Sequence, residues 1–319
     1  MSDRKLPVIV VSEPLNESSL EYLRAHGEVR MATAQTAKQA VTDADALVVR
    51  TYTRVNQELL SAARRLKVVG RAGVALENVD VPACRARGIE VVHTPEANTL
   101  AVVDYTIGMI IEMNRRFWPM TGFMPPEDFH KARSQMYGRF LSGLTLGIVG
   151  CGRIGSRVGR AAIGLGMRVL YNDILDIRVD YPAEAVDKPT LYATSDIVTI
   201  HVPITKLTRG MIDSSALAQF KPGAQFINAA RGQCVNYADL GAALGGGRIS
   251  AAVIDCHDPE PPPPGYPLFG LDNVILTPHV AARVPEAVQR MCDVVFDVVA
   301  VLQGRTPRFA APAEPDEET

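Results

Sequence analysis

Three ionisable side chains, Arg231, Glu260 and His279, each come shortly after an apolar run in the second half of the chain. In an open α/β sheet, ligands bind beyond the carboxyl ends of the strands. If these apolar runs are strands of one sheet, the three side chains converge on one edge of it. Taken singly, each is more often a surface or capping residue, and only their joint placement indicates a site.

An arginine, a carboxylate and a histidine together suit hydride transfer between a cofactor and a small 2-oxo acid. A protonated histidine, held by a carboxylate on its other ring nitrogen, donates a proton to the forming alkoxide. The planar guanidinium of an arginine holds the carboxylate and carbonyl oxygens of the acid. The hydride has to come from a nicotinamide cofactor such as NADH.

A glycine-rich motif predicts where such a cofactor binds. The run Gly150-Cys151-Gly152-Arg153-Ile154-Gly155 follows a strand-like stretch and opens a helix-like one. Gly150 permits a tight turn, Gly152 lets a pyrophosphate approach the backbone, and Gly155 lets the helix pack closely on the strand. The N–H groups at the start of the helix favour the phosphate charge.

Asp173 lies eighteen residues after Gly155, where the next expected strand ends. A carboxylate there accepts hydrogen bonds from the ribose hydroxyls and repels a 2′-phosphate, which favours NAD over NADP. The neighbouring Asn172 weakens that preference. A plain strand–turn–helix with a surface aspartate is the alternative, and it explains the ordered series of strand, glycines, helix and acid less well.

The elements that position these residues alternate along the chain as strand-like and helix-like segments. The long apolar helix Thr99–Asn114 precedes the second series. Six strands are expected there: Leu146–Val149, Arg168–Asn172, Ile197–His201, Ala224–Asn228, Ala251–Asp255 and Val274–Thr277. Six strands joined by helical crossovers are enough for a complete doubly wound parallel sheet.

A first series of shorter strands predicts a second α/β domain. These strands are Pro7–Val11, Ala46–Val49, Val68–Val69 and Ile89–His93, and the last apolar helix is Pro285–Leu302. Residues 117–142, which begin with Phe117-Trp118-Pro119, are expected to be irregular and to form an inter-domain connection or an arm that contacts a second subunit. The tail Arg305–Thr319, rich in proline, alanine and acids, is expected to be disordered.

Composition excludes several classes of protein. A length of 319 residues suggests about two domains. With 33 basic and 35 acidic residues, a net charge of −2 and no basic tract, neither nucleic acid nor an anionic membrane is an expected partner. Apolar runs fall short of the ~20 residues of a membrane helix. The five cysteines are dispersed and odd in number, which favours reduced thiols in a cytoplasmic protein, and no metal site is predicted.

The ordered motifs resemble those of the D-isomer-specific 2-hydroxyacid dehydrogenases, and most closely the D-3-phosphoglycerate dehydrogenase-like branch. Besides the glycine motif, the resemblance is carried by the segments Leu66–Val74, Ser195–Thr205, Asn228–Gly232 and Pro267–His279. It extends from about residue 6 to about residue 304. It implies a Rossmann-type doubly wound domain, residues 99–283, inserted into a flavodoxin-like substrate domain formed by residues 1–98 and 284–319. It also implies a homodimer.

The same resemblance assigns roles to individual residues. It implies that Arg231 binds the substrate carboxylate, that Glu260 pairs with His279, and that His279 is the acid–base. His201 then forms a wall of the cofactor site and carries no proton. The expected NAD contacts outside the glycine motif are Val102, Asp173, His201, Val202, Pro203, Thr208, Ala229, Ala230 and Asp255.

On the substrate side, the resemblance implies that the backbone of Gly73, Val74 and Ala75 binds the substrate carboxylate together with Arg231 and His279. Ala75 stands where the family usually has glycine and narrows the pocket. Arg50 and Arg71 match anion-binding positions of phosphoglycerate dehydrogenases, and the equally weighted alternative is that both are salt-bridged arginines beside the core. If they bind substrate, it carries a second anionic group.

Three functions are consistent with these residues. The first is an NAD-dependent dehydrogenase of 3-phosphoglycerate, of hydroxypyruvate or glyoxylate, or of a related anionic acid. The second is an NAD-sensing interaction protein, because corepressors that resemble the family keep the same three residues. The third is a dehydrogenase of another small anion such as phosphite or formate. Formate dehydrogenases of the family have glutamine at the position of Glu260, which disfavours that version.

Overall fold

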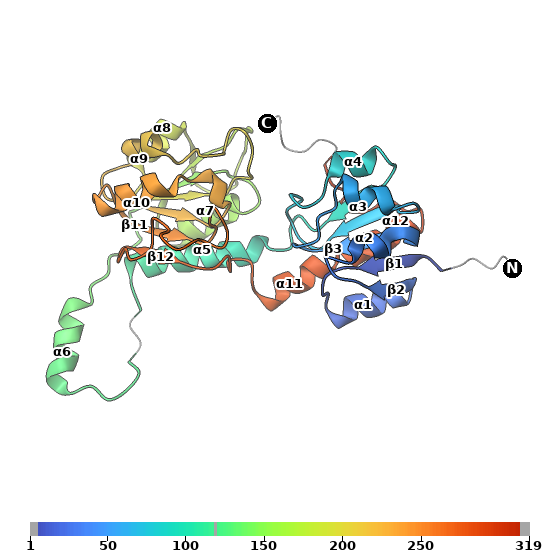
Figure 1. The fold of residues 1–319 in the computed structure, drawn as a ribbon. Coiled ribbons are helices and arrows are strands. Elements are labelled where there is room, and N and C mark those ends of the chain that lie inside the picture. Colours follow the sequence, from blue (N-terminus) through green and yellow to red (C-terminus); the bar gives the residue numbers. More distant parts are fainter. Residues whose placement is uncertain (1–5, 118–119, 313–319) are drawn as a thin grey trace. The chain divides into compact units, whose positions relative to one another are not determined.

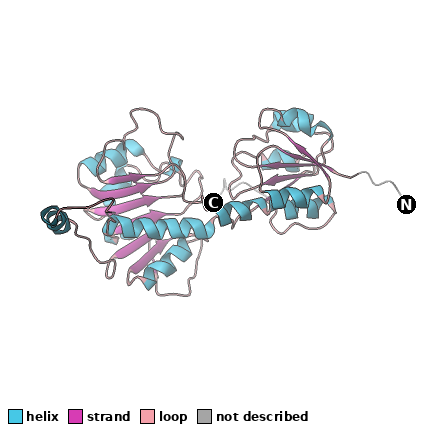
Figure 2. Ribbon diagram, turned by 90° about the horizontal axis from the view of Figure 1, so that it is seen from below, coloured by secondary structure: helices cyan, strands magenta, loops and turns pink. Residues whose placement is uncertain are grey.

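The computed structural model describes residues 6–117 and 120–312. The described residues form two compact units: one of residues 6–98 and 283–312, the other of residues 99–282 without 118 and 119. Both units are built on a parallel sheet, as predicted, and helices cover both faces of each sheet (Figure 1 and Figure 2). Among the described helices, none has both the length and the apolar character needed to cross a membrane.

The first unit has a five-stranded parallel sheet of order β2-β1-β3-β4-β5. This is the flavodoxin-like order, and it confirms the predicted fold class. The strands are β1 (Val8–Val11), β2 (Glu28–Met31), β3 (Ala46–Val49), β4 (Val68–Arg71) and β5 (Glu90–His93). The helices are α1 (Glu17–Arg24), α2 (Ala37–Ala40), the 3₁₀ turn η1 (Val41–Asp43), α3 (Gln57–Ala62), α4 (Val81–Arg85), α11 (Pro285–Cys292) and α12 (Val294–Leu302).

Close packing of α12 on this sheet depends on a glycine in β4. A methyl group on Gly70 would collide with the side chain of Val298 on α12. Val294, Val295, Val298 and Val299 of that helix are buried against one face of the sheet. Because α12 comes after residue 283, the C-terminal part of the chain completes the core of the N-terminal part.

The second unit has a seven-stranded parallel sheet of order β12-β11-β10-β9-β6-β7-β8. Counted from β6, this is the doubly wound order 3-2-1-4-5-6 with one strand added, so the predicted Rossmann-type sheet is confirmed. The strands are β6 (Thr145–Val149), β7 (Arg168–Asn172), β8 (Glu184–Ala185), β9 (Ile197–Ile200), β10 (Ala224–Asn228), β11 (Ile249–Ile254) and β12 (Val274–Leu276).

Two cores flank this sheet. Apolar side chains of α5 and α7 pack on one face, and those of α8, α9 and α10 pack on the other. The helices of the unit are α5 (Thr99–Asn114), α6 (Pro126–Gln135), α7 (Gly155–Gly164), α8 (Lys188–Thr194), α9 (Ser214–Gln219), η2 (Gly232–Cys234) and α10 (Tyr237–Gly245).

The structure corrects the expectation that residues 117–142 are irregular throughout. Helix α6 lies within this stretch, and none of its residues is buried. Pro126 at its first position and the acids Glu127 and Asp128 in its first turn favour a helix start. Trp118 and Pro119, named in that expectation, lie outside the described residues.

Two expectations for the C-terminal part are also wrong. The single helix expected over residues 285–302 is broken at Asp293 into α11 and α12. Residues 305–312 of the tail are ordered: Ala310 bridges Val92 of β5, and the Ala311 N–H donates to the Val91 carbonyl at 2.7 Å. Pairing with a strand far away in sequence holds this segment, and residues 313–319 lie outside the described part.

Candidate active site

The glycine motif forms the turn between β6 and α7. Gly150 has a φ of +90°, and a Cβ there would lie 2.7 Å from the His201 carbonyl oxygen. A Cβ on Gly155 would collide with the Gly150 carbonyl. In contrast, a Cβ on Gly152 would meet no atom within 4 Å. The first and third glycines thus serve the protein's own packing, and the middle one leaves an open backbone face.

That open face fits the pyrophosphate of a dinucleotide. It stands at the N-terminus of α7, whose first N–H groups favour an anion. Arg153 beside it is exposed, whereas Ile154 is partly buried against the core. The residues of this turn therefore match the requirements of the cofactor predicted from the motif.

Asp173 directly follows β7 and lies beside the glycine turn. Its carboxylate accepts hydrogen bonds from the Cys151 N–H at 2.7 Å and from the Leu175 N–H at 3.0 Å. These two contacts fix a carboxylate next to the motif. This is the relation expected of an acid that binds a ribose.

On the other side of the turn, β9 leads into the segment that begins with His201. Burial lowers the pKa of His201 to about 4, so the imidazole is neutral at pH 7. Its Nε2 lies 3.1 Å from the Thr199 hydroxyl. Val202 packs at Gly150, and the Thr208 hydroxyl donates to the Pro203 carbonyl at 2.7 Å. These residues form an ordered wall, and a neutral His201 is unsuited to donate a proton.

A small apolar cluster is the last of the expected cofactor contacts. Val102 of α5 packs with Ala229, which follows β10, and with Ala281, which follows β12. All three are buried. Ala230 continues the turn after β10 and is buried as well. Three separate segments thereby meet beyond the carboxyl ends of the strands.

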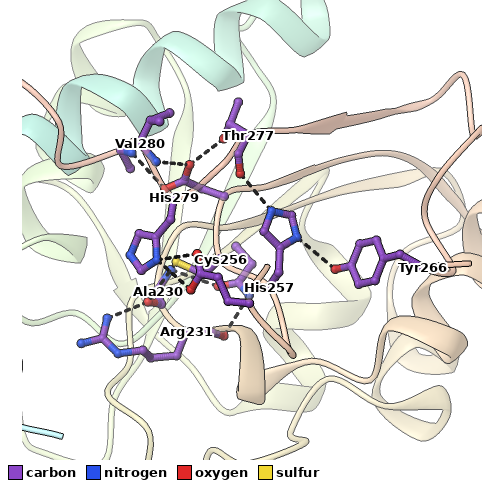
Figure 3. A network of polar contacts seen from close by, with 12 residues as sticks. Ala230, Arg231, Cys256, His257, Tyr266, Thr277, His279 and Val280 are labelled. Carbon is purple, nitrogen blue, oxygen red and sulfur yellow. Dashed lines mark hydrogen bonds and ion pairs between the residues drawn. The ribbon is translucent and has the colours of Figure 1, made fainter. Parts of the chain in front are cut away.

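Glu260 and His279 form the contact that the family resemblance implies. The Nδ1 atom of His279 lies 2.9 and 3.0 Å from the two carboxylate oxygens of Glu260. The two side chains are 46% and 41% exposed, so a substrate can reach them. Figure 3 shows His279 and Arg231 on the same side of a polar network.

His279 adopts a left-handed backbone conformation with φ of +53°, and it alone does so among the described non-glycine residues. The fully buried Asp255 holds the turn. Its carboxylate accepts hydrogen bonds from the Thr277 hydroxyl at 2.6 Å and from the N–H groups of Val280 at 2.7 Å and Ala281 at 2.9 Å. Its carbonyl accepts the His279 N–H at 2.9 Å. Sequence reasoning gave Asp255 only a cofactor contact.

Arg231 stands on the turn after β10, and Asn228 fixes that turn. The Asn228 side chain accepts from the Ala230 N–H and donates to the Arg231 carbonyl, both at 3.0 Å. The guanidinium Nη1 donates to the Ala230 carbonyl at 2.8 Å. The arginine is thus held by short-range contacts, and its half-buried side chain lies at the predicted edge of the sheet.

A buried polar network lies beside these residues, to the right of His279 and Arg231 in Figure 3. His257 bridges the Thr277 carbonyl at 2.9 Å and the Tyr266 hydroxyl at 3.2 Å. The Tyr237 hydroxyl donates to the Cys256 carbonyl at 2.5 Å. The network ties together the segments that carry Glu260 and His279. Nothing in local sequence pattern signals it, because its partners are nine to twenty residues apart.

The residues expected to bind substrate apart from Arg231 and His279 belong to the first unit. Arg50 follows β3, Arg71 ends β4, and Gly73 to Ala75 follow β4. Gly73 has a φ of +148°, and a Cβ there would collide with the Arg71 guanidinium. The Val74 carbonyl lies 2.8 Å from His93 Nδ1. All five therefore gather at the carboxyl ends of two neighbouring strands.

Comparison with known proteins shows which family this architecture belongs to. Residues 107–281 match the family model described as D-isomer specific 2-hydroxyacid dehydrogenase, NAD binding domain. The chain is 36% identical over 310 residues to a D-3-phosphoglycerate dehydrogenase from Archaeoglobus fulgidus, covering 95% of this chain and 58% of that protein. It therefore spans less than two thirds of the length of that relative.

A relative of similar length and a solved structure agree with this match. A hydroxypyruvate reductase from Thermotoga maritima is 32% identical over 287 residues, which are 88% of this chain and 93% of that protein. The holo D-mandelate dehydrogenase of Rhodotorula graminis superposes with a TM-score of 0.86 at 26% identity, covering 99% of this chain and all of the other. The chain belongs to the D-isomer-specific 2-hydroxyacid dehydrogenase family, in its D-3-phosphoglycerate dehydrogenase-like branch, and its second unit carries the NAD-binding domain of that family.

Proposed function

We propose that the protein is an NAD-dependent dehydrogenase that interconverts a small 2-hydroxy acid and the corresponding 2-oxo acid. The observation that carries this proposal is the contact between Glu260 and His279, exposed at the edge of the sheet that also carries the open glycine turn. A proton donor is needed wherever a hydride reduces a carbonyl. This pair supplies one beside a dinucleotide site.

The proposed chemistry assigns one task to each residue. In the reducing direction, bound NADH supplies a hydride to C2 of the acid. With Nδ1 donating to Glu260, His279 Nε2 gives its proton to the carbonyl oxygen, which becomes the hydroxyl. Glu260 stabilises the positive charge of the ring before this transfer and holds the orientation of the ring throughout. Arg231 binds the carboxylate of the acid, and the reverse reaction returns the proton to His279.

We further propose which residues hold the cofactor. The pyrophosphate binds at Gly150, Gly152, Arg153, Ile154 and Gly155, and the ribose binds at Asp173, which favours NAD over NADP. The remaining contacts come from Val102, His201, Val202, Pro203, Thr208, Ala229, Ala230 and Asp255. In this proposal residues 99–283 form the cofactor domain, while residues 1–98 and 284–319 form the substrate domain.

The substrate proposal rests on the first unit. The backbone of Gly73, Val74 and Ala75 binds the carboxylate, and the guanidinium groups of Arg50 and Arg71 favour a second anionic group. A phosphorylated acid such as 3-phosphoglycerate needs that second site, whereas hydroxypyruvate and glyoxylate do not. Relatives named for all three activities match the chain. All three acids therefore belong in the assay: hydroxypyruvate and glyoxylate as 2-oxo acids with NADH, and 3-phosphoglycerate as a 2-hydroxy acid with NAD.

The test follows NADH absorbance with a panel of 2-oxo acids, and NADPH is run in parallel. His279→Ala should lower kcat by about 10²–10⁴-fold, because the proton donor is removed. His130→Ala, on the exposed face of α6, is the matched control and should keep the wild-type rate. NADH binding without turnover of any acid would contradict the proposal and favour an NAD-sensing interaction protein.

The partner and location are part of the same proposal. We infer a homodimer, because the segment around α6 exposes large apolar side chains that a lone chain would leave in water: Phe117, Met120, Phe123, Phe129, Met136, Tyr137 and Phe140. We infer a cytoplasmic location, because all five cysteines are buried and free.

A further inference from the structure

A buried carboxylate outside the site described above organises the loop after β3. Glu13 lies two residues beyond β1 and is 6% exposed. It accepts hydrogen bonds from four consecutive backbone N–H groups: Arg50 at 2.9 Å, Thr51 at 2.8 Å, Tyr52 at 3.1 Å and Thr53 at 2.9 Å. Successive N–H groups that converge on one anion form a nest of the kind that binds phosphate. Here the anion belongs to the chain itself.

The carbonyl groups of the same loop are held from the other side. The Asn78 amide donates to the Arg50 carbonyl at 3.0 Å and to the Thr53 carbonyl at 2.8 Å. The Ser12 and Thr53 hydroxyls lie 2.8 Å apart. Side chains from the loops after β1 and β4 therefore fix both the donors and the acceptors of residues 50–53.

The topology explains why this place matters. In the order β2-β1-β3-β4-β5, the chain leaves β1 toward one side of the sheet and β3 toward the other. Ligands of open α/β sheets bind at such a switch point. Because Glu13 fills the nest there, residues 50–53 have no backbone N–H group left for an anionic ligand. What it presents is the side chain of Arg50, whose Nη1 donates to the Pro14 carbonyl at 3.1 Å.

We infer that Glu13 is a positioning residue, which holds the loop 50–53 in the conformation that directs Arg50 toward an anionic group of the substrate. This inference rests on the proposed function. Burial raises the pKa of Glu13, but the hydrogen bonds from Thr53, Tyr52, Arg50 and Thr51 outweigh it and bring the pKa below its usual value. The carboxylate is therefore ionised at neutral pH and keeps all four donors engaged.

The experiment compares Glu13→Gln with wild type in the NADH assay on the 2-oxo acids. The amide turns an NH₂ group toward the N–H groups of the loop and so loosens it. We expect KM for the acid to rise at least about tenfold. The dissociation constant of NADH, measured by fluorescence, should stay within about twofold, and kcat at saturating acid within about threefold.

Asp45→Asn is the matched control. Asp45 is also a buried carboxylate of the first unit that accepts a backbone hydrogen bond, from Val8 at 3.0 Å, but it lies at the opposite end of β3. This variant should lower Tm and leave KM unchanged. Asn78→Ala loosens the same loop without altering a charge. This variant tests the same loop if Glu13→Gln does not fold, and it should also raise KM for the acid.

The outcomes separate the two proposals. A wild-type chain that reduces none of the acids overturns the proposed function and, with it, the substrate role of this loop. A wild-type chain that is active, with KM unchanged in Glu13→Gln or, if that does not fold, in Asn78→Ala, leaves the proposed function standing and overturns the role of Glu13. Faster amide exchange at residues 50–53 of Glu13→Gln, with the sheet still protected, supports the inference.

Discussion

At the scale of single residues, the candidate site depends on a strained turn held by a buried acid. A non-glycine residue in the left-handed region costs on the order of 1 kcal/mol or more, and His279 adopts that conformation. Asp255 offsets the strain, because its carboxylate and carbonyl together take four hydrogen bonds from residues 277–281. The orientation of the imidazole therefore depends on a residue that does not touch it.

We predict that Asp255→Asn lowers kcat by about 10–100-fold. An amide has one acceptor oxygen in place of two, so at least one N–H of the turn loses its partner and His279 shifts from the proton-transfer position. Steady-state assays of the variant measure this loss. The dissociation constant of NADH should change by less than about threefold if Asp255 acts mainly through the turn.

Asp196→Asn is the control for that prediction, because Asp196 also accepts a backbone hydrogen bond in the second unit, from Thr145 at 2.9 Å, but at the opposite edge of the sheet. It should reduce Tm without changing kcat. If Asp255→Asn weakened NADH binding strongly and left kcat at saturating NADH intact, the main role of Asp255 would be the cofactor contact proposed above, and its support of the His279 turn would not matter for catalysis.

His201 makes a pH prediction of its own. Its pKa is lowered to about 4 from an ordinary value of 6.5, so the unfolded chain binds a proton more readily than the folded one. The stability contributed by its neutral form should be complete above pH 6.5, decline as the pH falls below 6.5 and level off near pH 4. As the pH falls from 7 to 4, the Tm of His201→Asn should decrease less steeply than the Tm of the wild-type protein. Identical slopes for the two proteins would show that the ring is not held neutral by burial.

The three ionisable residues were predictable from sequence, because each follows a recognisable strand and parallel strands end at one edge. The role of Asp255 was not, since its partners lie 22 to 26 residues away and only the folded sheet brings them near. The same holds for Glu13, whose partners on the loop after β3 are about forty residues distant. Local sequence patterns predict which helices and strands form, but they do not predict hydrogen bonds between loops.

At the scale of elements, the glycine turn separates packing from binding. Two of its glycines are required by contacts within the protein, whereas the third faces open space. A glycine-to-alanine substitution should therefore affect cofactor binding at one position of the turn and protein stability at another.

We predict that Gly152→Ala weakens NADH binding at least about tenfold while Tm changes by no more than about 2 °C, since the added methyl meets no protein atom within 4 Å and would stand on the face proposed for the pyrophosphate. Gly155→Ala should lower Tm by several degrees, because its methyl collides with the Gly150 carbonyl. Titration of NADH fluorescence and thermal unfolding of both variants measure the two effects. Equal loss of Tm in the two variants would contradict this division.

Most strands of the second sheet were predictable from their apolar runs, and the observed β6 and β10 begin within a residue of the expected positions. Helix α6 was missed because it buries no side chain, so it lacks the apolar periodicity that identifies a helix. Residues 305–312 were missed because a strand far away in sequence orders them. Both failures concern segments whose structure does not come from a local apolar pattern.

At the scale of the whole molecule, the two units share one structural feature: an aspartate that binds a backbone N–H group at the amino ends of the strands. Asp45 directly precedes β3 in the first sheet, and Asp196 directly precedes β9 in the second. Each accepts a hydrogen bond from the first N–H of the neighbouring strand across the switch point, that of Val8 in β1 or of Thr145 in β6. Basic side chains accompany both: Arg65 and Lys67 with Asp45, and Lys221 with Asp196. The pKa of both carboxyls is lowered, because these hydrogen bonds and charges outweigh the opposing effect of burial. At the amino ends of both sheets the charged side chains are thus engaged in contacts within the protein. The residues proposed to bind ligands lie at the carboxyl ends.

The segment around α6 gives the last prediction, which concerns the assembly of whole chains. Phe123, Tyr137 and Phe140 are each more than 80% exposed, and nothing in the described part of the chain covers them. Burying apolar surface of this size against a second copy is favourable by about 25 cal/mol per Å². Sedimentation of the wild-type protein should therefore give twice the mass of one chain, and Tyr137→Asp with Phe140→Asp should give a single chain. Lys131→Asp on the same helix changes charge without removing apolar surface and should leave the dimer intact. A wild-type monomer at micromolar concentration would refute the dimer.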